Sequence, residues 1–535
     1  MFDVSNQPPP LEPYNLFASD TALREAVKRE GAGWGGARLN ALGATLGKPE
    51  TIQFGIDANK FPPSLRSFDR FGHRVDEVDF HPAWHELLAI ALGAGLHSGP
   101  WAEPKPGAHV MRAAGCYLLN QIESGVYCPL AMTYGSVPTL RHAPKIAAQW
   151  LPKILAPSYD RRFVPIGEKS GALIGMGLTE NQGGSDLRTN TTRAEPAGGS
   201  FRLYGHKWFL SVPMCDAFLV LAQSPKGLSC FFMPRWTPDG ARNALRINRL
   251  KDKLGNKSNA SSEVEFDGAY AELVGEEGRG IPIMIEMAGY TRLDCCIGSS
   301  SLMRQAVAQA LHHARHRTAF QKKLIDQPLM SNVLADLALE CEAATVLSMR
   351  LARAYDESDE ASQAIRRVVT PAGKFWICKR APFVTLEAME VLGGSGYIEE
   401  SIMPRLYREA PVNSIWEGSG NVMCLDMLRA IGRTPNIGDV LRAEFDGGDA
   451  RLKAFAKRLI DRLGAPERND EAQARALTRD LVLGLQAALL VKHAPAAVTD
   501  AFCASRLSGE SGGAFGTLPR GADLRAIVER AAPLN

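Results

Sequence analysis

The sequence predicts an α+β fold in which a helical region, an antiparallel β region, a four-helix bundle and a further helical tail follow one another. Two observations predict this order. Apolar residues recur every three or four positions between about residues 81 and 155, and again after residue 280. Between these regions lie short runs rich in Phe, Val and Leu, separated by turns that contain Gly and Pro. Short strands without intervening helices favour an antiparallel sheet or a small barrel over βαβ units.

The domain boundaries that follow are residues 1–170 for an N-terminal extension and helical domain, 171–282 for a β-domain, 283–434 for the bundle and 435–535 for a C-terminal helical domain. Within the first domain, residues 1 to about 65 are predicted to form an irregular lead-in, with one amphipathic segment from Leu23 to Gly31.

Helices are expected where the apolar period persists between breaks at Gly and Pro. In the first helical region they cover 84–92, 110–123 and 144–154. In the bundle they cover 281–318, 328–356, 365–392 and a fourth segment that opens within 414–421 and runs through Arg429. In the β region, residues 201–211 predict a strand, a turn centred on Gly205 and a second strand, followed by strands at 216–222, 228–233 and 263–266.

Composition limits the classes of function. The chain has 61 basic and 58 acidic residues and a net charge of +3, which does not indicate a strongly basic nucleic-acid binder. Its ten cysteines include no Cys-x-x-Cys pair, so neither a zinc site nor a disulfide framework is predicted. The start lacks the features of a secretory signal, and no apolar run is long enough for a bilayer. We therefore expect a cytoplasmic location, reduced thiols, no metal and no membrane.

The candidate catalytic residue is Glu417, in the stretch Ser414-Ile415-Trp416-Glu417-Gly418-Ser419-Gly420-Asn421. Apolar neighbours at 415 and 416 would keep this carboxylate poorly hydrated and raise its pKa, as suits a base near neutral pH. The glycines allow close approach of a ligand, and a helix start beyond them would offer N–H groups to an anion. A turn with a solvated Glu is the alternative.

A second candidate site is the loop Gly175-Met176-Gly177-Leu178-Thr179-Glu180-Asn181-Gln182-Gly183-Gly184-Ser185-Asp186. Its two Gly clusters and its hydroxyl groups suit the binding of an electron-rich ligand edge by backbone N–H groups. It is not a dinucleotide fingerprint, because the third Gly and a βαβ unit are missing. A polar loop without a ligand is the alternative.

Five motifs in order resemble the acyl-CoA dehydrogenase flavoproteins between about Pro82 and Arg429. They are residues 180–186, His206-Lys207-Trp208-Phe209-Leu210-Ser211, Arg317-Thr318-Ala319-Phe320, Val391-Leu392-Gly393-Gly394-Ser395-Gly396-Tyr397 and Trp416-Glu417-Gly418-Ser419. The resemblance implies the fold of that family: a helical domain, a β-domain and a four-helix bundle. Residues 14–17, 181–186, 251–261 and 411–421, with the N- and C-terminal extensions, look like the AidB branch, which acts in the adaptive response to DNA alkylation.

The resemblance also implies roles for single residues, with FAD as cofactor. Glu417 would remove the α-proton of an acyl-CoA while a hydride leaves the β-carbon for the flavin. Cofactor contacts are implied for Met176, Leu178, Thr179, Gly184, Ser185, Phe209, Ser211, Arg317, Gly418, Ser419 and Asn421. Phe209 stands where the family usually has Trp and Ser211 where it has Thr, so an aromatic wall and a hydroxyl remain. Gln321 replaces a usual Gly and Glu390 a usual Gln, near the adenine end of the cofactor.

Other conspicuous residues are interpreted as structural. His312, His313 and His316 lack a third metal ligand, and His81 and His85 are interpreted likewise. Cys295, Cys296, Met423 and Met427 are expected to be packing residues of helices.

The C-terminal domain is where the AidB branch implies binding of double-stranded DNA. The candidate contacts are Arg429, Arg451, Lys453, Lys457 and Arg458. Residues 437–535 contain 14 basic and 13 acidic side chains, which read alone are typical of a solvated helical domain.

The leading hypothesis is an FAD-containing, DNA-associated flavoprotein that protects against alkylation and retains acyl-CoA dehydrogenation, assembled as a homotetramer. One alternative is a metabolic acyl-CoA dehydrogenase for short or branched chains, whose tail serves assembly. Another is a DNA-coating protein in which FAD is structural.

Overall fold

The computed structural model describes residues 3–508 and 513–533. Residues 1–2 of the expected lead-in, and 509–512 and 534–535 of the expected C-terminal domain, lie outside the described residues. Backbone contacts divide the chain into two compact units. The first contains Met1–Pro49, Lys105–Gln121 and Arg292–Asn535, and the second contains Glu50–Pro104 and Ile122–Thr291. The α+β fold is confirmed, and the linear domain boundaries stay a prediction.

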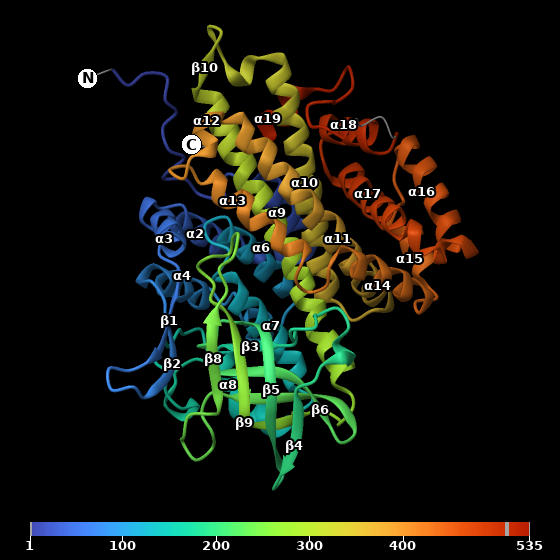
Figure 1. The fold of residues 1–535 in the computed structure, drawn as a ribbon. Coiled ribbons are helices and arrows are strands. Elements are labelled where there is room, and N and C mark those ends of the chain that lie inside the picture. The colour runs from blue at the N-terminus through green and yellow to red at the C-terminus, as the bar shows by residue number, and fades with distance from the viewer. Residues whose placement is uncertain (1–2, 509–512, 534–535) are drawn as a thin grey trace. The chain divides into compact units, whose positions relative to one another are not determined.

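The first unit is built on long helices of the predicted bundle (Figure 1). They are the part of α9 (Gly280–His316) from residue 292 on, α10 (Pro328–Asp356), α11 (Glu360–Val391) and α14 (Gly420–Gly432). These bounds lie within a few residues of the predicted ones for the first three, because each helix has Pro, Asp or Gly at its ends and an apolar face several turns long.

Shorter elements complete this unit. They are α1 (Thr21–Val27), α2 (Gly36–Leu46), α6 (Ala108–Asn120), β10 (Thr318–Ala319), β11 (Lys322–Lys323), α12 (Gly394–Tyr397), α13 (Met403–Glu409), α15 (Ile437–Glu444), α16 (Ala450–Gly464), α17 (Ala474–His493), α18 (Ala496–Arg506) and α19 (Leu524–Ala531). The helices α15 to α19 confirm a helical C-terminal region; α17 packs on α10 and α11, and α19 on α10.

The expectation of an irregular lead-in was wrong, because α1, α2 and α3 (Pro49–Lys60) fill most of residues 21–60. Asp20 caps α1 by accepting a hydrogen bond from the N–H of Leu23 at 2.9 Å. Gly47, which directly follows α2, allows close packing of the backbone. A Cβ at Gly47 would lie 1.6 Å from the carbonyl oxygen of Tyr14, so only glycine fits there.

The second unit combines a small sheet with the remaining helices, α4 (Pro82–Gly93), α5 (Gly99–Ala102), α7 (Tyr127–Leu140) and α8 (Pro144–Ile154). The sequence did not predict α7, whose residues are nearly all buried and therefore show no amphipathic period. It also missed the hairpin of β1 (Ser64–Phe68) and β2 (Arg74–Asp79).

The sheet contains β3 (Ile174–Gly177), β4 (Arg193–Ala197), β5 (Ser200–Ser211), β6 (Ala217–Ser224), β7 (Gly227–Pro234), β8 (Leu245–Leu250) and β9 (Ser261–Val274). Its strands run in the order β3-β6-β4-β5-β9-β7, and β7 also pairs with β6, which closes the strands into a ring. Most pairs are antiparallel, while β3 and β4 each pair with β6 in parallel. Figure 1 shows α7 and α8 behind these strands.

The predicted turn at Gly205 was wrong, because β5 is one continuous strand. Gly205 has φ +143°, and a Cβ there would lie 2.7 Å from the Cα of Thr192 in the loop before β4. The glycine therefore permits a close approach of backbone inside the sheet.

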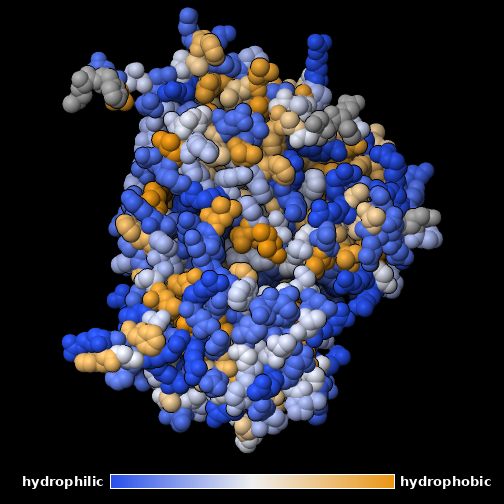
Figure 2. All heavy atoms as spheres, viewed as in Figure 1, coloured by the Kyte–Doolittle hydropathy of each residue, from blue (hydrophilic) through white to orange (hydrophobic). Residues whose placement is uncertain are grey.

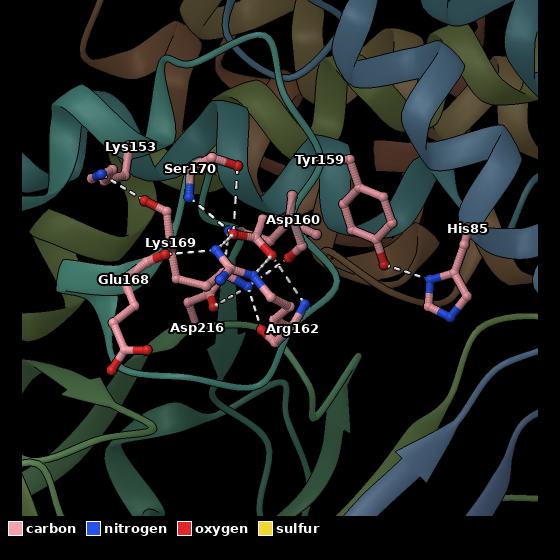
Figure 3. Close-up of polar contacts among 10 residues, drawn as sticks. His85, Lys153, Tyr159, Asp160, Arg162, Glu168, Lys169, Ser170 and Asp216 are labelled. Carbon is pink, nitrogen blue, oxygen red and sulfur yellow. Dashed lines mark hydrogen bonds and ion pairs between the residues drawn. The ribbon is translucent and has the colours of Figure 1, made fainter.

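A buried lysine fixes the connection between α8 and β3 (Figure 3). The Nζ of Lys169 donates to the carbonyl oxygens of Asp160 at 2.5 Å and Arg162 at 2.7 Å, and it pairs with Asp216 at 3.1 Å. Asp216 also accepts from the N–H of Leu173 at 2.8 Å. This loop is thus tied to the start of the sheet by charged hydrogen bonds.

None of the helices in the described residues has the length and apolarity needed to cross a membrane.

Replacement of Asp294 by Asn should destabilise the first unit strongly. The two nitrogens of the Arg112 guanidinium donate to Asp294 at 2.6 and 2.8 Å, and each side chain is only 2% exposed. Loss of the paired charge leaves a buried cation, so urea unfolding should show a loss of about 3–5 kcal/mol. The control Glu529→Gln breaks the exposed pair with Arg525 and should change the free energy of unfolding by less than about 0.5 kcal/mol. Equal effects would contradict the assignment.

Candidate functional site

The stretch around Glu417 forms a sharp turn before α14. A short 3₁₀ helix ends at Ser414, and α14 begins at Gly420 with Ser419 as its N-cap. Glu417 has φ +58° and Gly418 has φ +101°. A glutamate in this region of backbone space is uncommon and is typical of functional sites.

Two cations hold the backbone of this turn. The Nζ of Lys374 in α11 donates to the carbonyl oxygen of Gly418 at 2.6 Å, and Lys374 is only 1% exposed. The Nε of Arg292 in α9 donates to the carbonyl oxygen of Glu417 at 3.0 Å. Arg292 also pairs with Asp426 of α14 at 2.8 Å. Three bundle helices therefore position the carboxylate through its main chain.

The two apolar neighbours of Glu417 differ. Trp416 is half-buried and donates from Nε1 to Asn413 at 3.0 Å. Ile415 is 66% exposed, so the expectation that it shields Glu417 from water was wrong for this chain. The 3₁₀ helix turns residue 415 outward, and the half-buried carboxylate keeps an open side.

The first turn of α14 meets the C-terminal region. The Nε of Arg475 in α17 donates to Oδ1 of Asn421 at 2.8 Å. Beside this bond, Ala474 belongs to a buried cluster with Phe375, Met423 and Cys424. The predicted cofactor residue Asn421 is thus oriented by Arg475 of the C-terminal helices, a residue that the sequence did not connect with this site.

The predicted cofactor residues of the second unit lie on β3, on the loop after it and on β5. The main-chain oxygen of Thr179 accepts from the N–H of Trp208 at 2.8 Å, which joins the loop to β5. A Cβ at Gly184 would lie 2.4 Å from Oγ1 of Thr179, so glycine lets the two ends of the loop approach. The structure brings together in this unit Met176, Leu178, Thr179, Gly184, Ser185, Phe209 and Ser211.

A buried ion pair fixes that loop. The Nζ of Lys207 donates to Glu180 at 2.7 Å, and both side chains are fully buried. Glu180 also accepts from the N–H groups of Thr191 at 2.6 Å and Thr192 at 3.1 Å. Burial lowers the pKa of Lys207 to about 8 despite the attraction of Glu180. Burial raises the pKa of Glu180, but Lys207 and the donors of residues 191 and 192 outweigh it and hold the pKa at about 2.

Phe209 is half-exposed on β5, as an aromatic wall for a ligand would be. The Nζ of Lys251 lies 4.7 Å from the centre of its ring and 3.7 Å from that of Trp208. Lys251 begins the segment 251–261, which is fixed by a hydrogen bond from Ser258 to Glu123 at 2.7 Å. This segment therefore has a structural role beside the predicted flavin wall.

Arg317 follows α9 in the first unit and is held by the N-terminal lead-in. Its Nη1 donates to the carbonyl oxygen of Asn6 at 2.5 Å, and the side chain of Asn6 bonds both main-chain groups of Thr318. Gln321 has φ +63°, a conformation that costs a glycine nothing, which explains the usual Gly at this position.

The predicted DNA contacts of the C-terminal region fall into two kinds. Arg451 is engaged by Asp449 at 2.6 Å and Asp500 at 2.9 Å. The candidates that are exposed and form no ion pair with a described residue are Arg429, Lys453, Lys457 and Arg458. Figure 2 shows mainly hydrophilic side chains at the edge where α16 lies in Figure 1.

The residues interpreted as structural pack as expected. His312 bonds the carbonyl oxygen of Pro9 at 2.8 Å, and no group of three metal-binding side chains occurs among the residues that the structure describes. Cys295, Cys296, Met423 and Met427 are buried. All ten cysteines are free, as predicted.

Sequence reasoning missed Lys374 and Arg292, whose only signal was a basic residue within an apolar stretch of helix.

Three family models match the chain. They are the adaptive response protein AidB N-terminal domain over residues 6–161, the acyl-CoA dehydrogenase middle domain over 175–269 and the acyl-CoA dehydrogenase C-terminal domain over 278–432. The putative acyl-CoA dehydrogenase AidB of Escherichia coli K12 is 49% identical over 517 residues, which is 95% of each chain.

Two further relatives come from Caenorhabditis elegans. Acyl-CoA dehydrogenase family member 11 is 30% identical over 441 residues, covering 79% of this chain and 69% of that protein. The crystal structure of ACDH-11 in complex with C11-CoA is 25% identical, with a TM-score of 0.83 over the whole of this chain and 94% of that chain.

Replacement of Glu180 by Gln should destabilise the second unit, because the charge of Lys207 would stay buried without its counter-ion. We expect a loss of about 3–5 kcal/mol in urea unfolding. The double variant Glu180→Gln, Lys207→Met should recover part of this loss. The stabilisation that charged Glu180 provides is complete above pH 4.5 and is lost as the pH falls toward 2. A single variant as stable as the parent chain would contradict this account.

Proposed function

The chain belongs to the acyl-CoA dehydrogenase family, in its AidB branch, and on that premise we propose that Glu417 is the base of an FAD-dependent α,β-dehydrogenation of acyl-CoA thioesters. The family is FAD-dependent. The observation that carries the proposal is the turn at Glu417, where positive φ values and two cationic anchors present a half-buried carboxylate at a helix start.

The residues present fit an FAD. Ser419, the N-cap of α14, makes no side-chain capping bond, and the start of a helix suits an anionic part of a nucleotide. In the other unit, the half-exposed Phe209 and the hydroxyl of Ser211 suit a flat ring. We propose that FAD is held by Met176, Leu178, Thr179, Gly184, Ser185, Phe209, Ser211, Arg317, Gly418, Ser419 and Asn421.

The reaction divides between cofactor and protein. FAD, when bound, supplies the acceptor for a hydride. The Glu417 carboxylate takes the α-proton of the thioester, the Cα–H electron pair becomes the new double bond, and the β-hydrogen leaves with its own electron pair. Lys374 and Arg292 bind main-chain oxygens of the turn, so they hold in place the residue that carries the base. The C11-CoA bound by ACDH-11 supports an acyl-CoA as the substrate class.

Replacement of Glu417 by Gln should abolish bleaching of the flavin by an acyl-CoA and leave FAD bound. The amide has the size of the carboxylate but cannot accept the α-proton, so we expect a loss of at least about 10³-fold in the reduction rate. Stopped-flow absorbance measures the rate, and the visible spectrum measures bound FAD. Bleaching at the parental rate would refute Glu417 as the base.

We propose a second function, the binding of double-stranded DNA by the exposed face of α16, in support of protection against alkylation. Lys453 and Lys457 are one turn apart on this helix, are exposed and form no ion pair with a described residue. Such side chains are free to neutralise phosphates, whereas the paired Arg451 is less so. Binding through phosphates alone predicts no preference for sequence.

The double variant Lys453→Ala, Lys457→Ala should weaken DNA binding by the same factor for duplexes of unrelated sequence. The slope of log affinity against log salt should fall in magnitude by about 2, because each neutralised phosphate contributes about 0.9. Fluorescence anisotropy at several salt concentrations measures both quantities. The variant Arg525→Ala, at an exposed residue paired with Glu529, serves as control. An unchanged slope in the double variant would favour a metabolic enzyme without a DNA role.

We also propose a homotetramer in the cytoplasm. Large apolar side chains of the first unit are exposed in the single chain, and contact with a second copy would cover them. They include Phe320 at 93%, Leu329 at 84% and Tyr397 at 79% exposed.

If FAD stays bound but no acyl-CoA bleaches it, the alternative of a DNA-coating protein with structural FAD would replace the enzymatic proposal.

A further inference from the structure

A cavity of about 600 Å³ lies in the first unit between the bundle and the C-terminal helices. Residues of α10, α11 and the end of α18 line one side, and residues of α16, α17 and the described positions 507–508 and 513–515 line the other. Its volume is in the range of pockets that bind small molecules. None of the residues proposed above to hold FAD lines it.

Cations on the bundle side of the cavity have their acidic partners already. Arg506 pairs with Asp336 and lies 3.3 Å from Glu340. Arg380 lies 3.1 Å from Glu340. Two guanidinium groups therefore share two carboxylates, and this side is close to neutral.

The side formed by α16 and α17 has an excess of positive charge. Arg462 and Arg479 share a single carboxylate, that of Asp480, at 2.5 and 2.8 Å. Arg458 lines the cavity and forms no ion pair with a described residue. Among the residues that the structure describes, the cavity lining holds five arginines and three carboxylates, an excess of two positive charges. Such an excess favours a dianion, and guanidinium groups match phosphate oxygens in geometry.

Aromatic rings lie beside these charges. The guanidinium of Arg380 is 5.7 Å from the ring centre of Trp376 and 5.1 Å from that of Phe515, and Arg458 is 5.8 Å from that of Phe455. Trp376, Phe455 and Phe515 all line the cavity, so a flat ring would stack on aromatic walls.

We propose that this cavity binds a small phosphate monoester that carries a flat ring, a ligand of the size and chemistry of a mononucleotide. The two uncompensated positive charges bind the phosphate, and the aromatic side chains stack on the ring. The site is separate from the turn of Glu417, so its ligand is neither the substrate nor the cofactor of the dehydrogenation.

The test is calorimetric titration of the FAD-loaded protein with AMP and, separately, with inorganic phosphate. We expect one AMP per chain and binding of AMP at least about tenfold tighter than that of phosphate, because only AMP offers a ring. Arg458→Ala and Phe515→Ala should each weaken AMP binding by about tenfold or more, since one removes a positive charge and the other a stacking ring. Lys457→Ala changes the neighbouring basic residue, which does not line the cavity, and should leave AMP binding unchanged while it weakens DNA.

Three results would overturn the proposal. They are no heat of binding with AMP at about 1 mM, equal affinities for AMP and phosphate, and unchanged AMP affinity in both Arg458→Ala and Phe515→Ala. Arg458 is exposed and Phe515 lies in a loop outside the helices, so thermal melting should show both variants folded. The dehydrogenase proposal is tested by the flavin reduction rate and is not affected by any of these outcomes.

Discussion

The buried ammonium of Lys374 holds a backbone conformation on which the candidate active site depends. Its bond to the oxygen of Gly418 is 2.6 Å long, and the adjacent bond from Arg292 holds residue 417. A glutamate with φ of +58° is strained, and such strain persists only where the surrounding structure opposes its relaxation. The helices α9 and α11 provide that opposition, so the four-helix bundle both carries the site and imposes its geometry.

In the second unit, a loop is also held in one conformation, but by a different arrangement. The loop after β3 has few apolar side chains to pack, and its conformation is fixed by the Glu180–Lys207 pair inside the sheet. Burial opposes the charge of the lysine, whereas four hydrogen-bond donors favour the charge of the glutamate. The pair therefore contributes more to defining the loop than to net stability.

The sequence allowed prediction of those features that have a repeating or family-specific signal. The bounds of α10 were predicted to the residue, because its apolar face continues for 29 residues. By contrast, α7 is buried on nearly all sides and has no period, and the helices α1 to α3 lie where an irregular lead-in was expected. Glu417 was found by its neighbours in sequence, whereas Lys374 lies 43 residues away and becomes its neighbour only through the bundle.

The contact between α17 and α14 determines how the extra helices can be studied. Ala474 lies in one cluster with Phe375, Met423 and Cys424, and Arg475 bonds Asn421. A chain shortened before residue 474 would expose this apolar cluster and release the first turn of α14. Loss of flavin or solubility in such a fragment would then reflect a damaged bundle. Single surface substitutions, which leave this junction intact, are the proper way to separate the roles of the two regions.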